Sequence, residues 1–81
     1  MQIKDKTIVI TGAGRGIGRS LAVRFARHGA NLALLDLNVE ELNQAAAQCA
    51  SFGVRAQAYT ADVSAEQQVA SALDQVVADF G

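Results

Sequence analysis

The sequence predicts an α/β fold with a parallel three-stranded sheet, because three short apolar runs alternate with three longer segments of helical period. No linker or low-complexity tract interrupts this alternation. A length of 81 residues allows one small domain, which we place at residues 1–81. Right-handed crossovers between parallel strands then predict the strand order 3-2-1, with helices on both faces of an incomplete doubly wound sheet.

The first strand is expected at residues 7–11, which are all β-branched, and its apolar centre predicts that both of its faces are covered. The first helix follows, because apolar residues recur every four positions at Ile17, Leu21 and Phe25. We expect these residues, with Ala22 and Ala26 beside them, to form its buried face, while Arg19, Arg24 and Arg27 face away. Gly29 suits the left-handed position that ends a helix.

The second strand is expected at residues 31–36, where four apolar residues follow Asn31 and Asp36 ends the run. Asn38, with Glu41 three residues later, is typical of a helix start, and this second helix is expected to continue to Gly53. Residues 54–60 form the weakest strand, because polar and small residues alternate there, and this predicts an edge position.

The third helix is expected to begin at a capping pair of Ser64 and Gln67 and to run to Phe80. No fourth strand follows, so the outer edge of the first strand, Ile8 to Ile10, has no partner in the sequence. We expect this edge to associate with a second chain or with the remainder of a larger fold.

Composition and charge exclude several functions. No apolar run is long enough to span a membrane, and a net charge of −1 gives no support for nucleic-acid binding. The single Cys49 cannot form an internal disulfide, it has no Cys or His at metal-ligand spacing, and the first residues lack a signal-peptide core. We therefore expect a cytoplasmic protein without a metal site, with Cys49 buried and His28 near a helix end rather than acting as a base.

The two halves of the chain nevertheless differ in charge. Residues 1–30 carry a net charge of +5 and residues 31–81 a net charge of −6. This distribution is compatible with an anion site in the first half, or with a basic helix face in contact with solvent.

The residues that indicate chemistry lie between the first strand and the first helix, in Thr11–Gly18. Glycines allow the sharp turn into a helix and let a pyrophosphate approach the backbone closely. The N–H groups at the helix start, together with the positive end of the helix dipole, can then hold phosphates. The candidate binding residues here are Gly12, Gly14, Arg15, Gly16, Ile17 and Gly18.

Two acids extend this candidate site. Asp36 ends the second strand, where a carboxylate can accept hydrogen bonds from both ribose hydroxyls of an adenosine. Asp62 follows the third strand, and either acid could instead have a local role, Asp36 in opening a turn and Asp62 in capping with Ser64. Together with the glycine-rich loop they would occupy the carboxyl ends of adjacent strands, where such folds bind ligands.

The glycine spacing discriminates between nucleotide-binding motifs. A strict Gly-x-Gly-x-x-Gly pattern fails, because Ile17 or Arg19 stands where glycine is required, and no Gly-Lys-Ser/Thr is present. The pattern Thr-Gly-x-x-x-Gly-x-Gly fits. With it, the whole chain resembles the short-chain dehydrogenase/reductase family, through Thr-Gly-Ala-Gly-Arg-Gly-Ile-Gly-Arg, Arg-His-Gly-Ala-Asn-Leu, Leu-Asp-Leu-Asn and Ala-Asp-Val-Ser.

The resemblance implies the N-terminal, adenosine-binding part of a Rossmann fold that takes NAD or NADP. It places Gly12 to Gly18 around the phosphates and Asp62 and Val63 near the adenine. Arg15 resembles a basic residue that often binds a 2′-phosphate, which favours NADP. Asp36 favours NAD, because a carboxylate would repel that phosphate, and Leu37 rather than an arginine follows it. We expect NAD.

The family's chemistry is hydride transfer between nicotinamide and an alcohol or carbonyl, assisted by a Ser, an Asn and a Tyr-x-x-x-Lys pair farther along the chain. Tyr59 has Val63 four residues later, so no catalytic residue is carried over and we expect the chain to be inactive alone. The alternatives are a non-catalytic module that binds nucleotide or self-associates and, less well supported, part of an S-adenosylmethionine-dependent methyltransferase. The latter also fits glycines 12, 14 and 16, but Ile10 replaces its usual acid.

Overall fold

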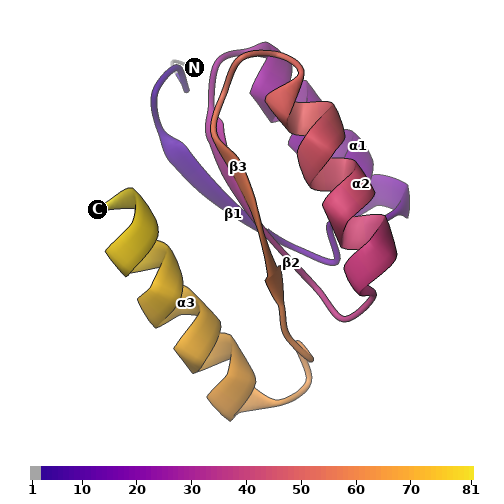
Figure 1. Cartoon of the computed structure of the whole chain (residues 1–81), viewed down its shortest axis with the longest axis vertical. Coiled ribbons are helices and arrows are strands. Elements are labelled where there is room, and N and C mark those ends of the chain that lie inside the picture. Colours follow the sequence, from indigo (N-terminus) through magenta and orange to yellow (C-terminus); the bar gives the residue numbers. More distant parts are fainter. Residues whose placement is uncertain (1–2) are drawn as a thin grey trace.

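The computed structural model describes residues 3–81, in which three parallel strands alternate with three helices. The elements are β1 (Thr7–Thr11), α1 (Gly16–Arg27), β2 (Asn31–Asp36), α2 (Val39–Ala50), β3 (Ala56–Thr60) and α3 (Glu66–Phe80). The sheet order is β1-β2-β3, which confirms the predicted order 3-2-1 with β3 at an edge. Helices α1 and α2 lie on one face of the sheet and α3 on the other (Figure 1).

The central strand β2 separates two hydrophobic clusters. Residues 32–35 are fully buried, and successive side chains point to opposite faces of the sheet. Leu32 and Leu34 belong to the larger cluster with residues of α1 and α2, whereas Leu35 packs in a smaller cluster with Ala61 and Ala72. Most of the core therefore lies beneath α1 and α2.

The buried face of α1 agrees with the prediction only in part. Ala22 and Ala26 are buried, whereas Ile17 is 81% exposed and Leu21 is 43% exposed. Residues four apart on a helix are offset by about 40° around its axis, so Ile17 lies roughly 80° away from Phe25. The two alanines and Phe25, which is partly buried against the core, therefore face the sheet, whereas Ile17 and Leu21 do not.

The coverage of β1 also differs from the prediction. Ile10 is buried beneath α1, but Val9 on the opposite face is 40% exposed. Helix α3 contacts the sheet at Leu35 and Tyr59, on β2 and β3. Within residues 3–81 one face of β1 is therefore partly uncovered, although its sequence is apolar on both faces.

The ends of α2 and β3 illustrate how side chains set element boundaries. Asn38 Oδ1 accepts a hydrogen bond from the Glu41 N–H at 2.9 Å, which confirms the predicted start of α2. The helix ends at Ala50 instead of Gly53, because the chain tightens into a turn in which the Gly53 N–H donates to the Ala50 carbonyl at 2.9 Å. Strand β3 begins two residues later than expected, at residue 56.

The predicted cap of α3 is wrong. The helix begins at Glu66 with Ala65 in the N-cap position, and no side-chain cap is formed among the described residues. Ser64 precedes the N-cap by one residue, and its N–H and its hydroxyl both donate to Asp62 Oδ1, at 2.9 and 2.6 Å. The Ser64 hydroxyl, which the capping pattern assigns to the helix, is therefore bonded to Asp62 instead.

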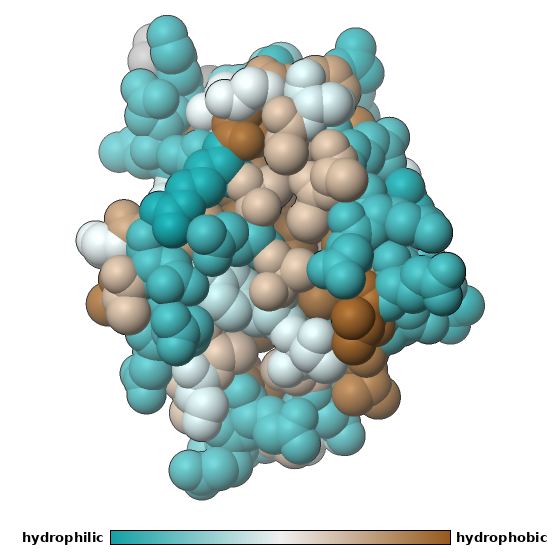
Figure 2. Space-filling model, viewed as in Figure 1, coloured by the Kyte–Doolittle hydropathy of each residue, from teal (hydrophilic) through white to brown (hydrophobic). Residues whose placement is uncertain are grey.

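Helix α3 is held to β3 by polar contacts at its C-terminal end. The Tyr59 hydroxyl donates to Asp79 Oδ2 at 2.7 Å, and Gln75 Nε2 donates to Asp79 Oδ1 at 3.0 Å. The Arg55 guanidinium lies 4.4 Å from the centre of the Phe80 ring. In the view of Figure 1, weakly hydrophobic residues occupy the middle of the surface over β3, and hydrophilic residues lie on both sides of them (Figure 2).

Two remaining expectations concern single features. Cys49 is fully buried, as predicted, and burial raises the pKa of its thiol. His28 follows the last residue of α1 as its C-cap, as expected. Across residues 3–81, no helix is both long enough and apolar enough to cross a membrane.

Candidate functional site

The segments that follow the three strands meet at the carboxyl edge of the sheet. The Ala13 N–H donates to the Leu35 carbonyl at 3.2 Å, which holds the glycine-rich loop against the end of β2. The Ala61 N–H donates to the Asp36 carbonyl at 3.0 Å and brings the segment after β3 to the same place. The structure therefore brings together the loop, Asp36 and Asp62, as the sequence predicts.

The glycine-rich loop leaves room in front of its backbone. Gly12 and Gly16 have φ angles of +64° and +62°, in the left-handed region that favours glycine. Among the described residues, no atom lies within 4 Å of the position that a Cβ would take at either glycine. A ligand oxyanion can therefore approach this backbone closely.

Gly18 has a different role, which depends on close packing. A Cβ at Gly18 would collide with the carbonyl oxygen of Gly12 and lie 2.8 Å from its carbonyl carbon. The first turn of α1 thus rests directly on the end of β1. This contact fixes where the helix begins relative to the loop.

The N-terminus of α1 is suited to hold an anion. Arg15 occupies the N-cap with extended backbone, and within residues 3–81 no side-chain cap and no first-turn acid compensates this end. The first backbone bond of the helix is donated by Arg19 to Arg15, at 3.4 Å, so the N–H groups of residues 16–18 have no intrahelical acceptor. These N–H groups and the helix dipole fit a diphosphate in the open space before the loop.

Asp36 connects the loop to β2. Its Oδ2 accepts a hydrogen bond from the Gly14 N–H at 2.8 Å, and its Oδ1 accepts one from the Leu37 N–H at 2.7 Å. The carboxylate is half-buried at the strand end, beside the open face of the loop. It thus fixes the turn after β2 against the loop and presents two acceptor oxygens at this edge of the sheet.

Asp62 is organised by contacts that follow it in the chain. The side-chain and backbone hydrogen bonds from Ser64 lower the pKa of Asp62, so this carboxylate is anionic at neutral pH. Gln68 Oε1 accepts the Asp62 N–H at 2.8 Å and ties the turn to α3. Sequence reasoning missed Gln68, because a side chain six residues away in a helix gives no local signal. Val63, beside Asp62, is 52% exposed at this edge.

Arg15 extends from the loop into solvent, with a side chain that is 84% exposed. Its Nε lies 3.8 Å from Glu41 Oε2, in the first turn of α2. The sequence identified Glu41 only as part of a helix start. The pairing could have been found only from the placement of α2 beside the loop.

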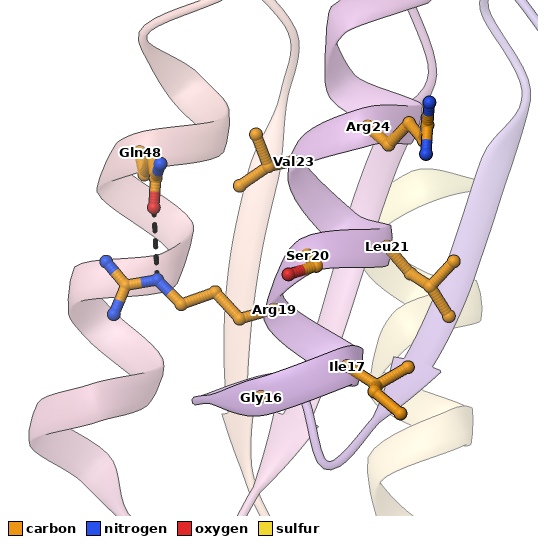
Figure 3. Close-up of a pocket in the computed structure, with 8 residues that line it drawn as sticks. All are labelled: Gly16, Ile17, Arg19, Ser20, Leu21, Val23, Arg24 and Gln48. Carbon is orange, nitrogen blue, oxygen red and sulfur yellow. Dashed lines mark hydrogen bonds between the residues drawn. The ribbon is translucent and has the colours of Figure 1, made fainter.

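A surface pocket lies along α1 rather than at the carboxyl edge (Figure 3). Its lining runs from Gly16 to Arg24 and includes Gln48 of α2, whose Oε1 accepts a hydrogen bond from Arg19 Nε at 3.0 Å. Asp36 and Asp62 do not line it. Only its Gly16 end reaches the loop, so this pocket is not the place where the predicted residues converge.

A parallel sheet with helices on both faces and a glycine-rich turn at its carboxyl edge defines the Rossmann class of α/β domains. The model of the short chain dehydrogenase family matches residues 6–81. The chain therefore belongs to the short-chain dehydrogenase/reductase family, an oxidoreductase family, and the methyltransferase alternative is wrong.

Relatives agree with this assignment. Human 17-beta-hydroxysteroid dehydrogenase 13 is 37% identical over 79 residues, which cover 98% of this chain and 26% of that protein. Short chain dehydrogenase/reductase dpmpG of Macrophomina phaseolina is 44% identical over 82 aligned positions, covering 96% of this chain and 45% of that protein. The chain thus spans less than half the length of either relative.

Solved structures share the fold closely. NAD+-bound xylitol dehydrogenase superposes with a TM-score of 0.95 at 42% identity, over 100% of this chain and 31% of that one. L-sorbose reductase from Gluconobacter frateurii, in complex with NADPH and L-sorbose, gives a TM-score of 0.92 at 34% identity, over 100% and 32% of the two chains. The matched region is therefore about one third of each of those chains.

Proposed function

We propose that this chain binds the adenosine diphosphate half of a nicotinamide dinucleotide for an oxidoreductase of the short-chain family. The observation that carries the proposal is the open loop at Gly12 and Gly16 before the unpaired N–H groups of α1. Asp36 would bind the ribose, and the segment around Asp62 and Val63 would lie beside the adenine. Similar structures were solved with NAD+ and with NADPH. They support binding of a nicotinamide dinucleotide and are compatible with either form.

NAD is the proposed form. Asp36 Oδ2 accepts a hydrogen bond from the Gly14 N–H of the loop and Oδ1 accepts one from the Leu37 N–H, so the negative charge is held close to the proposed ribose position. A phosphate on the 2′-oxygen would place a second anion beside this carboxylate, at an energetic cost. No cation follows Asp36 directly, since the next residue is Leu37.

The bound dinucleotide would supply the hydride carrier, and the residues of this chain would bind and orient it. Hydride transfer to or from an alcohol or carbonyl also needs a group that gives or takes a proton. The chain contains no Tyr-x-x-x-Lys pair, and the Tyr59 hydroxyl is engaged with Asp79. We therefore expect residues 1–81 to bind dinucleotide without turning over substrate.

Calorimetric titration of the chain with NAD and with NADP tests this function. We expect tighter binding of NAD, and we expect Asp36→Ala to weaken it by roughly tenfold or more, because two hydrogen bonds to a charged group are lost. Asp74→Ala, an exposed carboxylate on α3, is the matched control and should bind as the parent chain does. Tighter binding of NADP than of NAD would overturn the choice of cofactor.

The outer edge of β1 supports a second proposal, self-association. Within residues 3–81, β1 pairs only with β2, and Val9 is 40% exposed. Unpaired strand edges and exposed apolar faces favour pairing with another chain, or with the remainder of the fold where it is present. Sedimentation should show concentration-dependent association, and a monomer at every concentration would contradict the proposal.

A cytoplasmic location stays a prediction.

A further inference from the structure

Glu41 lies close enough to the glycine-rich loop to influence what the loop binds. It stands in the first turn of α2, where its N–H is fixed by Asn38 Oδ1 at 2.9 Å. Its side chain is 34% exposed, and Oε2 lies 3.8 Å from Arg15 Nε. The backbone of Glu41 is therefore held by a cap, while its side chain is directed at the one cation of the loop.

Gly14 explains why Glu41 can come so near. A Cβ at Gly14 would lie 2.7 Å from Asp36 Oδ2 and 3.2 Å from the Cβ of Glu41. The loop backbone thus packs directly against both acidic residues at this point. Arg15, the next residue, leaves the loop within reach of the Glu41 carboxylate.

This placement bears on the charge that the loop presents to a ligand. Arg15 is the cation that would attract a 2′-phosphate, and a guanidinium near a carboxylate has part of its charge compensated before any ligand arrives. A 2′-phosphate at Arg15 would have to compete with Glu41 for the guanidinium and would also experience repulsion from it. A ribose with a free 2′-hydroxyl carries no charge there, so neither effect applies to NAD.

We propose that Glu41 is a specificity-determining residue that pairs with Arg15 and so disfavours dinucleotides carrying a 2′-phosphate. The proposal rests on the proposed function, because it requires dinucleotide binding at this loop. It adds Glu41 to Asp36 as a residue that determines which dinucleotide binds. Asp36 acts at the ribose itself, whereas Glu41 acts by occupying the cation that would otherwise compensate for Asp36.

The effect is expected to be modest, because an exposed ion pair contributes little and salt screens it. We expect Glu41→Gln to bind NADP roughly two- to fivefold more tightly than the parent chain, with NAD changed by less than about twofold. The gain should shrink when the ionic strength is raised from about 0.02 M to about 0.3 M.

Three variants make the test specific. Glu40→Gln removes a carboxylate from the same helical turn that does not pair with Arg15 among the described residues, and it should leave the NADP-to-NAD ratio unchanged. Arg15→Ala with Glu41→Gln should lose the gain, since the freed guanidinium is absent. Titrations with 2′,5′-ADP and with 5′-ADP test the same contrast without the nicotinamide.

A second readout needs no nucleotide. The NMR signal of Arg15 Nε–H in the unliganded chain should shift in Glu41→Gln and remain in place in Glu40→Gln. If NAD binds but Glu41→Gln leaves the NADP-to-NAD ratio equal to that of Glu40→Gln, the role of Glu41 is overturned while the proposed function stands. If neither dinucleotide binds the parent chain or any variant, the proposed function fails and this inference fails with it.

Discussion

Gly18 makes the closest contact of the glycines in the loop. Any larger residue would place a carbon against the Gly12 carbonyl, which is backbone at the end of β1 and cannot rotate away. We predict that Gly18→Ala displaces the start of α1, lowers the free energy of unfolding by about 1–3 kcal/mol and abolishes dinucleotide binding. Urea unfolding and calorimetry measure the two effects.

The control for this prediction is Ser20→Ala, an exposed position two residues farther along α1. It should change neither stability nor binding appreciably. A Gly18→Ala chain with parental stability would show that the helix start tolerates displacement.

Single residues also show how far sequence patterns reach. The spacing of Gly12, Gly16 and Gly18 predicts the loop, because the turn, the open backbone and the close contact each require glycine within a short stretch. Glu41 and Gln68 could not be assigned in this way. They contact Arg15 and the backbone of Asp62 only because α2 and α3 lie beside these residues in the fold. No local sequence pattern predicts where those helices lie.

At the scale of elements, the strands are predicted more accurately than the helix faces. β1 and β2 have the predicted bounds, because β-branched or apolar runs closed by Gly12 and Asp36 leave little choice. The predicted face of α1 is correct for Ala22, Ala26 and Phe25 but wrong for Ile17 and Leu21, which are exposed. The apolar spacing alone does not show which end of the run reaches the sheet.

The start of α3 provides an element-scale prediction. Ala65 has the extended backbone of an N-cap residue, with φ −101° and ψ 101°, but it has no side-chain acceptor for the first N–H groups of the helix. We predict that Ala65→Ser supplies this acceptor and raises the free energy of unfolding by about 0.5–1 kcal/mol. The midpoint of urea denaturation measures the gain.

Ala70→Ser, an exposed position inside the same helix, is the matched control. It should lower stability slightly, because serine has a lower helix propensity than alanine. Equal effects of the two substitutions would mean that the α3 N-terminus is already satisfied.

At the scale of the whole molecule, the strand order follows from handedness and the helical layers follow from the strand order, so both were predictable from the alternation of elements. The unequal coverage of the two faces was not. α3 meets the sheet through a small cluster around Leu35 and Ala72, and through the polar contacts of Tyr59 with Asp79. How a helix distributes its contacts between apolar and polar groups depends on its angle and position on the sheet, which the periodicity of its sequence does not encode.

The contact between Tyr59 and Asp79 makes the attachment of α3 dependent on pH. Burial, followed by the hydrogen bond to Asp79 and the charge of that carboxylate, raises the pKa of Tyr59 from 10.0 to about 12. The hydrogen bond from Tyr59 is also the main cause that lowers the pKa of Asp79. The neutral hydroxyl beside an anionic carboxylate is therefore the form that the folded state favours.

A group whose pKa is raised on folding contributes stability that is complete below its unfolded pKa and is lost as the pH rises through the folded value. We therefore predict that the parent chain loses stability between pH 10 and about 12, and that Tyr59→Phe loses less over the same interval. Urea unfolding of both chains across this range measures the difference. Because Tyr59 is the only tyrosine, and because Cys49 titrates in both chains, the difference isolates this hydroxyl. Parallel stability curves would contradict the prediction and would mean that the Tyr59 hydroxyl does not contribute to holding α3.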